Sequence, residues 1–545
     1  MAKPAQNANI ARHLSRMARE SPDRAAVITQ ANGATTTFAE LEARTNRYAN
    51  GFVGIKIARG MRVLVLIKPG LDFAAVVFAL LKIGAVPVLI DSGMGVANML
   101  HCIRQVRPEA MIGIPRAHAL RLLRRGAFKS VLHVVTAGRR WLWGGHSLKR
   151  LHDRSSDRFE MATFRPADEA AILFTSGSTG PAKGVMYAHG MFDAQVRSIQ
   201  TQYGIEPGEV ELATFPLFAL FSPAMGTTCV FPDMDFSRPG RVDPRKIVEA
   251  VRTNGATSAF GSPALWLRVS DYCNERNITL PTLRRVLIAG APVRWQLVEH
   301  VKQFLSPEAD VHTPYGATEA LPVASISGEE VLRDCLEPIK AGAGTCVGRP
   351  LPGRSVKIIR ISDDAISEWS EDLVVPDGER GEIVVSGEVV THSYCELPRA
   401  THLAKIEDHG RVWHRMGDLG YFDEQGRLWF CGRKSQRVTT VRGTMFTEPC
   451  EAVFNLHPNI ARSALVGVGR RSAQTPVMVI EFRDRTPSRR ETKAAQADLI
   501  SWAGAREPIR EIQHVLFRTP LPVDVRHNAK INREALAAWA ETQLQ

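Results

Sequence analysis

The segment LFTSGSTGPAKG, residues 173–184, carries the strongest signal in the chain. An apolar run ends there in a loop of glycines and hydroxyl side chains with one lysine, Lys183. Glycines let backbone N–H groups approach phosphate oxygens closely, and serine and threonine hydroxyls donate further hydrogen bonds. The segment therefore predicts a phosphate site at the end of a buried strand. It is not a Walker A loop, because Ala182 and Gly184 stand where that motif requires glycine and then serine or threonine.

Strand-like runs alternate with helix-length segments on both sides of this loop. Helical spacing of apolar residues covers 70–83 and 242–253. This alternation predicts an α/β fold with parallel-rich sheets. A chain of 545 residues is also too long for one hydrophobic core, so two or more domains are expected. The expected strands are RVLVLI at 62–67, AVPVLI at 85–90, AAILFT at 170–175, ELATFP at 211–216, RRVLIAG at 284–290 and GEIVVSG at 381–387.

The pattern changes near Gly432, which predicts a domain boundary. Two strand-like runs with a turn at 423–426 precede this glycine, and a new strand–helix–strand pattern follows it. We expect a large N-terminal domain, residues 1–432, and a small α+β C-terminal domain, residues 433–545, joined by one hinge. Within the smaller domain, the charged segment RDRTPSRRETK, residues 483–493, is typical of a surface loop.

No segment of the chain indicates secretion or a membrane span. The first twenty residues lack an apolar core, and the most apolar stretch, 71–90, is interrupted by charges, glycine and proline. That stretch instead predicts a helix followed by a buried strand. Eight cysteines without any CxxC pair favour reduced thiols over disulfides or a zinc site. We therefore expect a cytoplasmic protein.

The formal charge of +13 is unevenly distributed. No acidic residue occurs between Glu109 and Asp153, and this interval also holds Trp141 and Trp143. One interpretation of region 116–150 is a docking surface for other enzymes of a pathway or for the periphery of a membrane. The other is a solvated basic face on an insertion. Nucleic-acid binding is not expected, because no binding motif accompanies the charge. The basic residues of the region are Arg116, Arg121, Arg124, Arg125, Lys129, Arg139, Arg140, Lys149 and Arg150.

The loop TSGSTGPAKG resembles the phosphate-loop signature of the adenylate-forming superfamily, which includes acyl-CoA synthetases, nonribosomal adenylation domains and luciferases. The remaining motifs of that superfamily follow in the expected order, and the resemblance covers roughly residues 10–540. They are LRRVLIAGAPV at 283–293, TPYGATE at 313–319, RMGDLG at 415–420, the hinge pair Gly432-Arg433, and a lysine motif, PVDVRHNAK, at 522–530.

The resemblance implies a two-domain enzyme that activates a carboxylic acid with ATP and Mg²⁺. Glu319 is the implied Mg²⁺ ligand, because its carboxylate is a hard oxygen donor. Tyr315 would cover the purine ring, and Asp418 would accept hydrogen bonds from the ribose. The implied catalytic residues are Lys530, Glu319 and Thr179. The implied nucleotide-binding residues are Thr175, Ser176, Gly177, Ser178, Gly180, Lys183, Ala291, Tyr315, Gly316, Thr318, Asp418 and Arg433.

Three departures from the superfamily's motifs bear on the step after adenylation, in which an acceptor displaces AMP from the acyl-adenylate. Ala219 replaces a histidine that many acyl-CoA synthetases carry near the acyl pocket. The hinge, GRKSQRV at 432–438, lacks a clear acidic or lysine pivot. The lysine motif has two extra residues, and Ala529 stands in place of glycine. This charged RHNAK form resembles the olefin β-lactone synthetases of bacterial long-chain hydrocarbon biosynthesis.

That closer resemblance implies a long-chain 3-hydroxy (2-alkyl) fatty acid as substrate. After adenylation, its own hydroxyl would displace AMP to give a β-lactone without CoA. His312 and His527 are candidates for the base that takes the hydroxyl proton, although a lone histidine is more often a hydrogen-bonding residue. One alternative is a fatty acyl-CoA or acyl-carrier-protein ligase with the same acyl-AMP intermediate. Another is an acyl-AMP-forming module of a multienzyme synthase.

Overall fold

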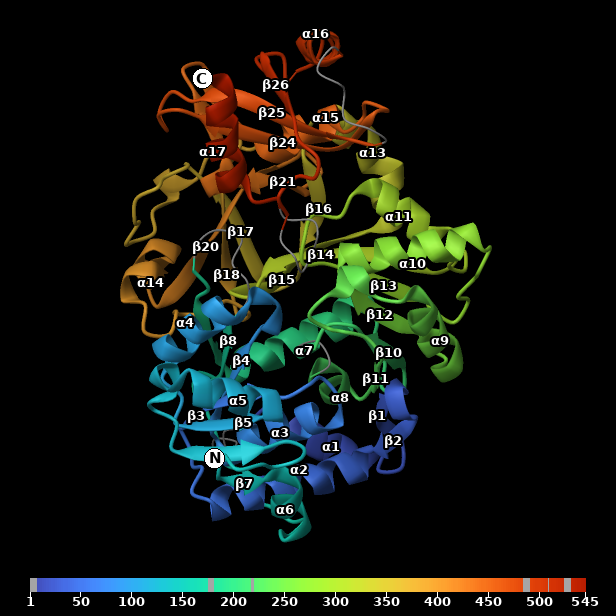
Figure 1. Ribbon diagram of the computed structural model, residues 1–545, viewed down its shortest axis with the longest axis vertical. Helices are drawn as coiled ribbons and strands as arrows, with labels where there is room; N and C mark the ends of the chain where they lie inside the picture. Colours follow the sequence, from blue (N-terminus) through green and yellow to red (C-terminus); the bar gives the residue numbers. More distant parts are fainter. Residues whose placement is uncertain (1–6, 175–180, 217–219, 484–490, 508, 524–530) are drawn as a thin grey trace.

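The computed structural model describes residues 7–174, 181–216, 220–483, 491–507, 509–523 and 531–545 (Figure 1). Two large sheets, of seven and fourteen strands, form most of the molecule, and a three-stranded sheet lies in the C-terminal part. Helices pack between and around these sheets (Figure 1). The mixed α/β architecture confirms the predicted fold class. Within the described ranges, no helix is long and apolar enough to cross a bilayer.

The seven-stranded sheet positions the predicted phosphate loop. Its pairs are parallel except for β8 with β9, which are antiparallel. Strand β8 ends at the buried Phe174, so the loop begins where a core strand ends, as predicted; residues 175–180 lie outside the described ranges. The strands, in spatial order, are β7 (His146–Ser147), β6 (His133–Thr136), β5 (Ala110–Gly113), β3 (Arg62–Leu66), β4 (Val86–Ile90), β8 (Glu169–Phe174) and β9 (Gly184–Ala188).

The predicted helix and strand at 71–90 are α3 (Leu71–Ile83) and β4. The helix is buried along nearly its whole length, which explains why its sequence is apolar on every side. Gly84 ends it in the left-handed conformation, with φ of 80°. The predicted helix at 242–253 is α9 (Pro244–Asn254), which begins two residues later because Asp243 caps it and accepts a hydrogen bond from the backbone of Arg245.

The fourteen-stranded sheet has a parallel part and an antiparallel part. Strands β11, β10, β12, β13 and β14 run parallel. The predicted strand GEIVVSG is β18, but it pairs antiparallel with β17 and β20. The reversal begins at the hairpin of β14 and β15. The main path is β17 (Arg354–Ile359), β18 (Gly381–Gly387), β20 (Arg411–Phe422), β21 (Leu428–Arg433), β16 (Thr345–Pro350), β15 (Ala320–Ser327), β14 (Asp310–Ala317), β13 (Arg285–Ile288), β12 (Ser258–Gly261), β10 (Val210–Ala213), β11 (Thr228–Phe231), β1 (Ala25–Thr29) and β2 (Ala34–Thr37), with β19 (Lys405–Asp408) beside β20.

The helices of the N-terminal part connect and cover the two sheets. Helix α7 (His189–Tyr203) lies between them in Figure 1 and follows directly after β9. Besides α3, α7 and α9, the helices of this part are α1 (Arg12–Glu20), α2 (Phe38–Gly54), α4 (Val96–Val106), α5 (Pro115–Leu123), α6 (Leu148–Asp153), α8 (Phe221–Met225), α10 (Pro263–Glu275), α11 (Trp295–Lys302), α12 (Gly328–Glu330), α13 (Leu336–Lys340) and α14 (Pro398–Ala404).

The chain after β21 builds its own apolar cores. Two clusters of buried side chains contain only residues from Val438 onward. This supports the predicted boundary between 432 and 433, which remains a proposal. Most of the predicted surface loop, residues 484–490, lies outside the described ranges. The elements are β22 (Val438–Thr440), β23 (Gly443–Met445), α15 (Thr447–Phe454), β24 (Ile460–Val468), β25 (Thr475–Phe482), α16 (Thr492–Gly504), β26 (His514–Phe517) and α17 (Arg533–Leu544).

Candidate active site

Glu319 lies in the two-residue turn that joins β14 to β15. Ala317 pairs with Ala320 across this turn, which is where the parallel part of the sheet gives way to the antiparallel part. Gly316 permits the close approach of the two strands, since an added Cβ would lie 2.7 Å from the carbonyl oxygen of Ala320. The side chain of Glu319 is half-buried. The sheet therefore presents one carboxylate at its point of reversal.

The turn is fastened to β9, the strand that follows the phosphate loop. The hydroxyl of Tyr187 on β9 donates to the carbonyl of Thr318 at 2.7 Å. Lys183 lies just before β9, and its Nζ is 4.9 Å from the centre of the Tyr394 ring. Tyr394 in turn donates its hydroxyl to Oε1 of Glu319 at 2.7 Å. The structure thus brings the predicted residues Lys183, Thr318 and Glu319 into one connected group.

Tyr394 belongs to a short segment, residues 390–395, which we call the strap. The strap pairs with Ala320 at one end and with Val185 near the other. Its backbone also donates from Thr391 N to the carbonyl of Glu319 at 2.9 Å, and from Cys395 N to the carbonyl of Gly184 at 2.7 Å. The strap therefore joins the Glu319 turn to the start of β9, so it fixes the Glu319 carboxylate relative to that strand.

Lys405 anchors the strap from the side of β19. Its ammonium donates to the carbonyl of Thr391 and, at 3.2 Å, to the hydroxyl of the same residue. The side chain is buried, and burial lowers its pKa to about 7, although the charge of Glu319 acts in the opposite direction. Its cross-strand neighbour His414 is also buried, and burial holds its pKa well below the usual range. A charged lysine in this position favours a nearby anion.

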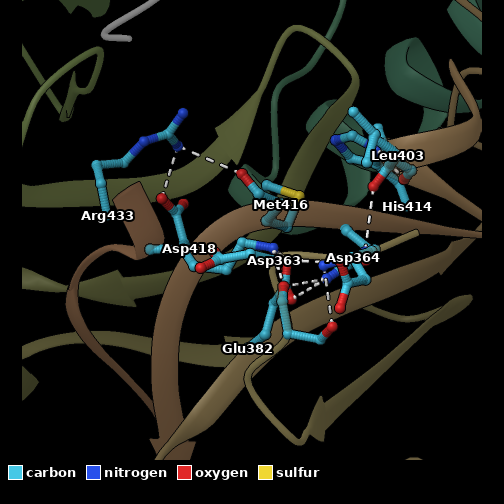
Figure 2. Close-up of polar contacts among 12 residues, drawn as sticks. Asp363, Asp364, Glu382, Leu403, His414, Met416, Asp418 and Arg433 are labelled. Carbon is cyan, nitrogen blue, oxygen red and sulfur yellow. Dashed lines mark hydrogen bonds and ion pairs between the residues drawn. The ribbon is translucent and has the colours of Figure 1, made fainter. Parts of the chain in front are cut away.

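Asp418 on β20 is held by two neighbours. Its Oδ1 accepts a hydrogen bond from Arg433 Nη1 at 2.6 Å, and its Oδ2 accepts one from the hydroxyl of Tyr315 at 2.7 Å. Figure 2 shows Arg433 reaching to Asp418 and to the carbonyl of Met416. Asp418 raises the pKa of Arg433, so this guanidinium stays charged. Burial, with a smaller contribution from Asp418, raises the pKa of Tyr315, so its hydroxyl remains a donor.

Beneath this pair lies a fully buried carboxylate, Glu382 on β18. Arg415 contacts it at 2.7 Å and Lys434 at 2.8 Å. Both cations also donate to the carbonyl of Ser362. Because Lys434 directly follows Arg433, this network fixes the first residue beyond β21. A buried carboxylate with two paired cations is costly to disrupt, since removing a partner leaves a charge uncompensated.

Gly432 brings the C-terminal part close to β21. Its φ is 123°, and an added Cβ would lie 2.2 Å from Oγ1 of Thr447 at the start of α15. A side chain at this position would push α15 away from the strand that carries Arg433. The glycine of the predicted hinge pair is therefore required by packing as well as by backbone conformation.

Other predicted residues lie apart from this group or outside the described ranges. Ala291 follows β13 and is half-buried. His312 lies on β14 with its ring 5.3 Å from that of Tyr203, and burial lowers its pKa. The predictions that fall outside the described ranges concern Thr175, Ser176, Gly177, Ser178, Thr179, Gly180, Ala219, His527, Ala529 and Lys530.

Sequence reasoning missed Tyr394, Lys405 and Glu382. Tyr394 lies in no motif that was considered, and a lysine in an exposed-looking helix–strand junction normally indicates a solvated side chain. Lys405 opens β19, whose burial pattern does not alternate, so no periodicity marked this lysine as buried. Glu382 occupies a strand interior, GEIVVSG, where a carboxylate requires a buried partner. That requirement could have directed attention to Arg415 and Lys434.

The described residues can be compared with what ATP and Mg²⁺ require of a binding site. Among the described residues, no group of three or more His, Cys, Asp or Glu side chains could hold a metal ion on its own. Mg²⁺ bound with a nucleotide usually takes one or two carboxylates and several phosphate oxygens. Glu319, near the cations Lys183 and Lys405, fits such a shared site. Asp418 also fits a ribose, because each carboxylate oxygen can accept more than the one bond it already has.

The comparisons with known proteins agree with this geometry. Residues 14–395 match the family of AMP-binding enzymes. The chain therefore belongs to the AMP-binding enzyme family, and the predictions of an adenylate-forming fold and of an enzyme of this class are confirmed. The fold also resembles the solved structure of amide bond synthetase McbA from Marinactinospora thermotolerans, with a TM-score of 0.79, 23% identity, and coverage of 98% of this chain and 99% of that one.

Two relatives share more sequence identity with this chain than that structure does. The chain is 45% identical to an olefin β-lactone synthetase from Stenotrophomonas maltophilia, covering 98% of this chain and 99% of the relative. It is 44% identical to an olefin β-lactone synthetase from Xanthomonas campestris pv. campestris, covering 98% of each. The predicted resemblance to this group, which was based on the motif around Lys530, is confirmed.

Proposed function

We propose that this protein is an ATP-dependent β-lactone synthetase acting on a long-chain 2-alkyl-3-hydroxy acid. The observation that carries the proposal is the 45% identity, over 98% of the chain, to the olefin β-lactone synthetase from Stenotrophomonas maltophilia. The described site adds the chemical groups that a nucleotide requires. These are a ribose-side carboxylate with a fixed cation, a second carboxylate for Mg²⁺, and a lysine beside the phosphate loop.

In the first half-reaction, a carboxylate oxygen of the substrate attacks the α-phosphorus of ATP, and pyrophosphate leaves. Asp418 accepts hydrogen bonds from the ribose, and Arg433 holds that carboxylate in place. Glu319 would hold Mg²⁺, which supplies charge stabilisation for the phosphates. Lys183 and the hydroxyls of residues 175–179 bind the departing pyrophosphate. Lys530 neutralises charge on the carboxylate and the α-phosphate as the new bond forms.

In the second half-reaction, the 3-hydroxyl oxygen attacks the acyl carbon of the adenylate. The ring C–O bond forms, the bond from the acyl carbon to the phosphate oxygen breaks, and AMP leaves with the electron pair. The hydroxyl proton passes to a base, for which His312 and His527 remain the candidates. Because the nucleophile is tethered, effective molarity of about 10⁵ M or more opposes the strain of the four-membered ring.

The decisive experiment incubates the full-length protein with ATP, Mg²⁺ and a long-chain 2-alkyl-3-hydroxy acid, with and without CoA. We expect AMP, pyrophosphate and a product lighter than the acid by one water, in equal yield without CoA. Product that appears only with CoA would instead identify an acyl-CoA ligase. Acyl-AMP that accumulates without ring closure or thioester would identify a module that supplies a separate synthase.

The compartment and partners follow from the same proposal. We place the reaction in the cytoplasm. All eight cysteines fall within the described ranges and are buried thiols, as expected of a protein from a reducing compartment. The long-chain acyl substrate is poorly soluble in water, so delivery from another enzyme or from a membrane is required. The basic region at 116–150 is the part of the chain that suits such a contact.

A further inference from the structure

Exposed apolar side chains gather in the same part of the chain as the basic residues. Among the described residues, eleven large hydrophobic side chains are exposed, and five of these lie between residues 122 and 142. Leu142 is fully exposed, and Leu123, Leu132 and Trp141 are 78%, 75% and 63% exposed. A soluble protein normally scatters such residues singly, so their concentration in one short stretch indicates an interaction site. We call the exposed side chains of residues 116–150 the basic–aromatic surface.

The exposed tryptophan is held outward by a fixed support. The ring of Trp143 stacks on His118 of α5 at 5.6 Å, and Trp141 stacks on Trp143 at 6.1 Å with an interplanar angle of 4°. Trp143 also donates its Nε1–H to the hydroxyl of Thr136 at 2.9 Å, and Arg121 donates to its carbonyl at 3.1 Å. The loop between β6 and β7 is therefore attached to α5, and Trp141 lies on this support with 63% of its surface exposed.

The cations of this surface have no acidic partners in the described part of the chain. Nine cations lie between residues 116 and 150, and none forms an ion pair with any carboxylate in the described part of the chain. No acidic residue occurs anywhere in the interval. Elsewhere, surface cations such as Arg165 and Arg245 have acidic partners. The basic–aromatic surface therefore carries a concentrated positive field that favours binding of an external anion.

We infer that the basic–aromatic surface docks on an anionic lipid bilayer. Basic side chains are attracted to anionic headgroups, while tryptophan and leucine insert at the boundary between headgroups and acyl chains. A nucleic acid would use the charges but would leave Leu123, Leu132 and Leu142 in water. In Figure 1, β7 and α6 lie at the end of the molecule opposite to α15 and α17, and α5 lies in the same half as β7 and α6, so docking through this part keeps the C-terminal part away from the membrane.

Docking would serve the proposed function, since a long-chain acid partitions into a bilayer and a docked enzyme meets it there. This advantage of docking rests on the proposed function, but binding of the protein to a bilayer does not depend on it. Vesicle binding without lactone formation would contradict the proposed function and leave this inference intact. Lactone formation by a protein that never binds vesicles would support the proposed function and contradict this inference.

The test measures co-sedimentation of the full-length protein with two kinds of vesicle. One kind contains phosphatidylcholine alone, and the other contains phosphatidylcholine with phosphatidylglycerol. We expect binding to the anionic vesicles that is at least about tenfold tighter and that weakens as salt is raised. Equal binding to both kinds, or binding to neither, would overturn the inference. Binding to soluble poly-glutamate but not to vesicles would also overturn it and would indicate an acidic protein partner.

A matched pair of variants locates the contact. Leu123 and Arg124 are adjacent exposed residues at the end of α5, and Leu267 and Arg268 are adjacent exposed residues on α10. The double variant Leu123→Ser with Arg124→Glu should lose about tenfold in vesicle affinity, whereas Leu267→Ser with Arg268→Glu should bind like the wild type. Trp141→Ala should also weaken binding. Equal affinities of the two double variants would place the contact elsewhere, and thermal melting verifies that each variant is folded.

Discussion

The two carboxylates of the active site, Asp418 and Glu319, are held in different ways. Each accepts a hydrogen bond of 2.7 Å from a tyrosine hydroxyl. Asp418 forms the last pair of the β20–β21 ladder, next to an irregularity between Leu419 and Gly420, and contacts its cross-strand partner Arg433 directly. Glu319 lies in a turn, and its position depends on the strap and on Lys405. The proposed ribose side is therefore held by neighbouring strands of one sheet, whereas the proposed metal side depends on a contact between distant segments.

The largest effect is expected from a residue that belongs to neither side. Lys530→Ala should slow acyl-adenylate formation by about 100- to 1,000-fold, because it removes charge stabilisation from the transition state only. Both carboxylates stay in place, so the dissociation constant of AMP should be unchanged. Pyrophosphate exchange gives the rate, and calorimetry gives the AMP affinity. A variant that exchanges at the wild-type rate would remove Lys530 from the mechanism.

A second prediction separates the two carboxylates. Glu319→Gln should lower the adenylation rate by about 100-fold and raise the Mg²⁺ concentration needed for half-maximal rate, because a neutral amide is a poorer metal ligand. Asp418→Asn should mainly weaken binding of AMP and leave the Mg²⁺ dependence alone. Titrations of Mg²⁺ at saturating ATP distinguish the variants. The same Mg²⁺ dependence in both would contradict the assignment of separate roles.

A third prediction tests the strap through Lys405, which is a positioning residue. Lys405→Met should lower the adenylation rate by about tenfold while the KM for ATP changes less, because Tyr394 and Glu319 lose their support but the ribose side does not. Lys405→Arg, which can still donate to Thr391, should restore part of the rate. Rates measured over a range of ATP concentrations provide the comparison. A loss confined to KM, with no rescue by arginine, would argue against positioning.

The smallest effect on activity is expected at Glu211, a buried carboxyl on β10, a strand that carries neither Glu319 nor Asp418. Ser222 donates to it at 2.5 Å, and burial raises its pKa to about 7. The folded state therefore holds this proton more tightly than the unfolded state, whose carboxyl has a pKa near 4.5. The contribution of this residue to stability is fully present below pH 4.5 and is lost as the pH rises through about 7.

Glu211→Gln should remove that pH dependence and keep normal activity. Relative to the wild type, the free energy of unfolding of the variant should rise by about 2–3 kcal/mol between pH 5 and pH 8. Urea denaturation at the two pH values measures the difference. A parallel pH response of the two proteins would show that Glu211 ionises normally in the folded state.

Sequence patterns predicted the elements whose signal is local. The helix and strand at 71–90, the strand before the phosphate loop and the hairpin around 423–426 need only apolar spacing and turn residues, and all are present. The antiparallel pairing of β18 was not predictable, because pairing direction depends on partners far along the chain. The motifs located Glu319, Asp418 and Arg433. The contacts of Tyr394 and Lys405 could not be predicted, because they too join residues far apart in the sequence.

The strap also constrains the order in which the protein acquires its function during synthesis. Gly184, at the end of the phosphate-loop motif, accepts a backbone hydrogen bond from Cys395. The strap also bonds to Glu319, which lies between Gly184 and Cys395 in the sequence. Contacts between such distant residues form late, because the intervening chain must first fold and close. A nascent chain therefore cannot hold the Glu319 carboxylate beside β9 until residue 395 has left the ribosome.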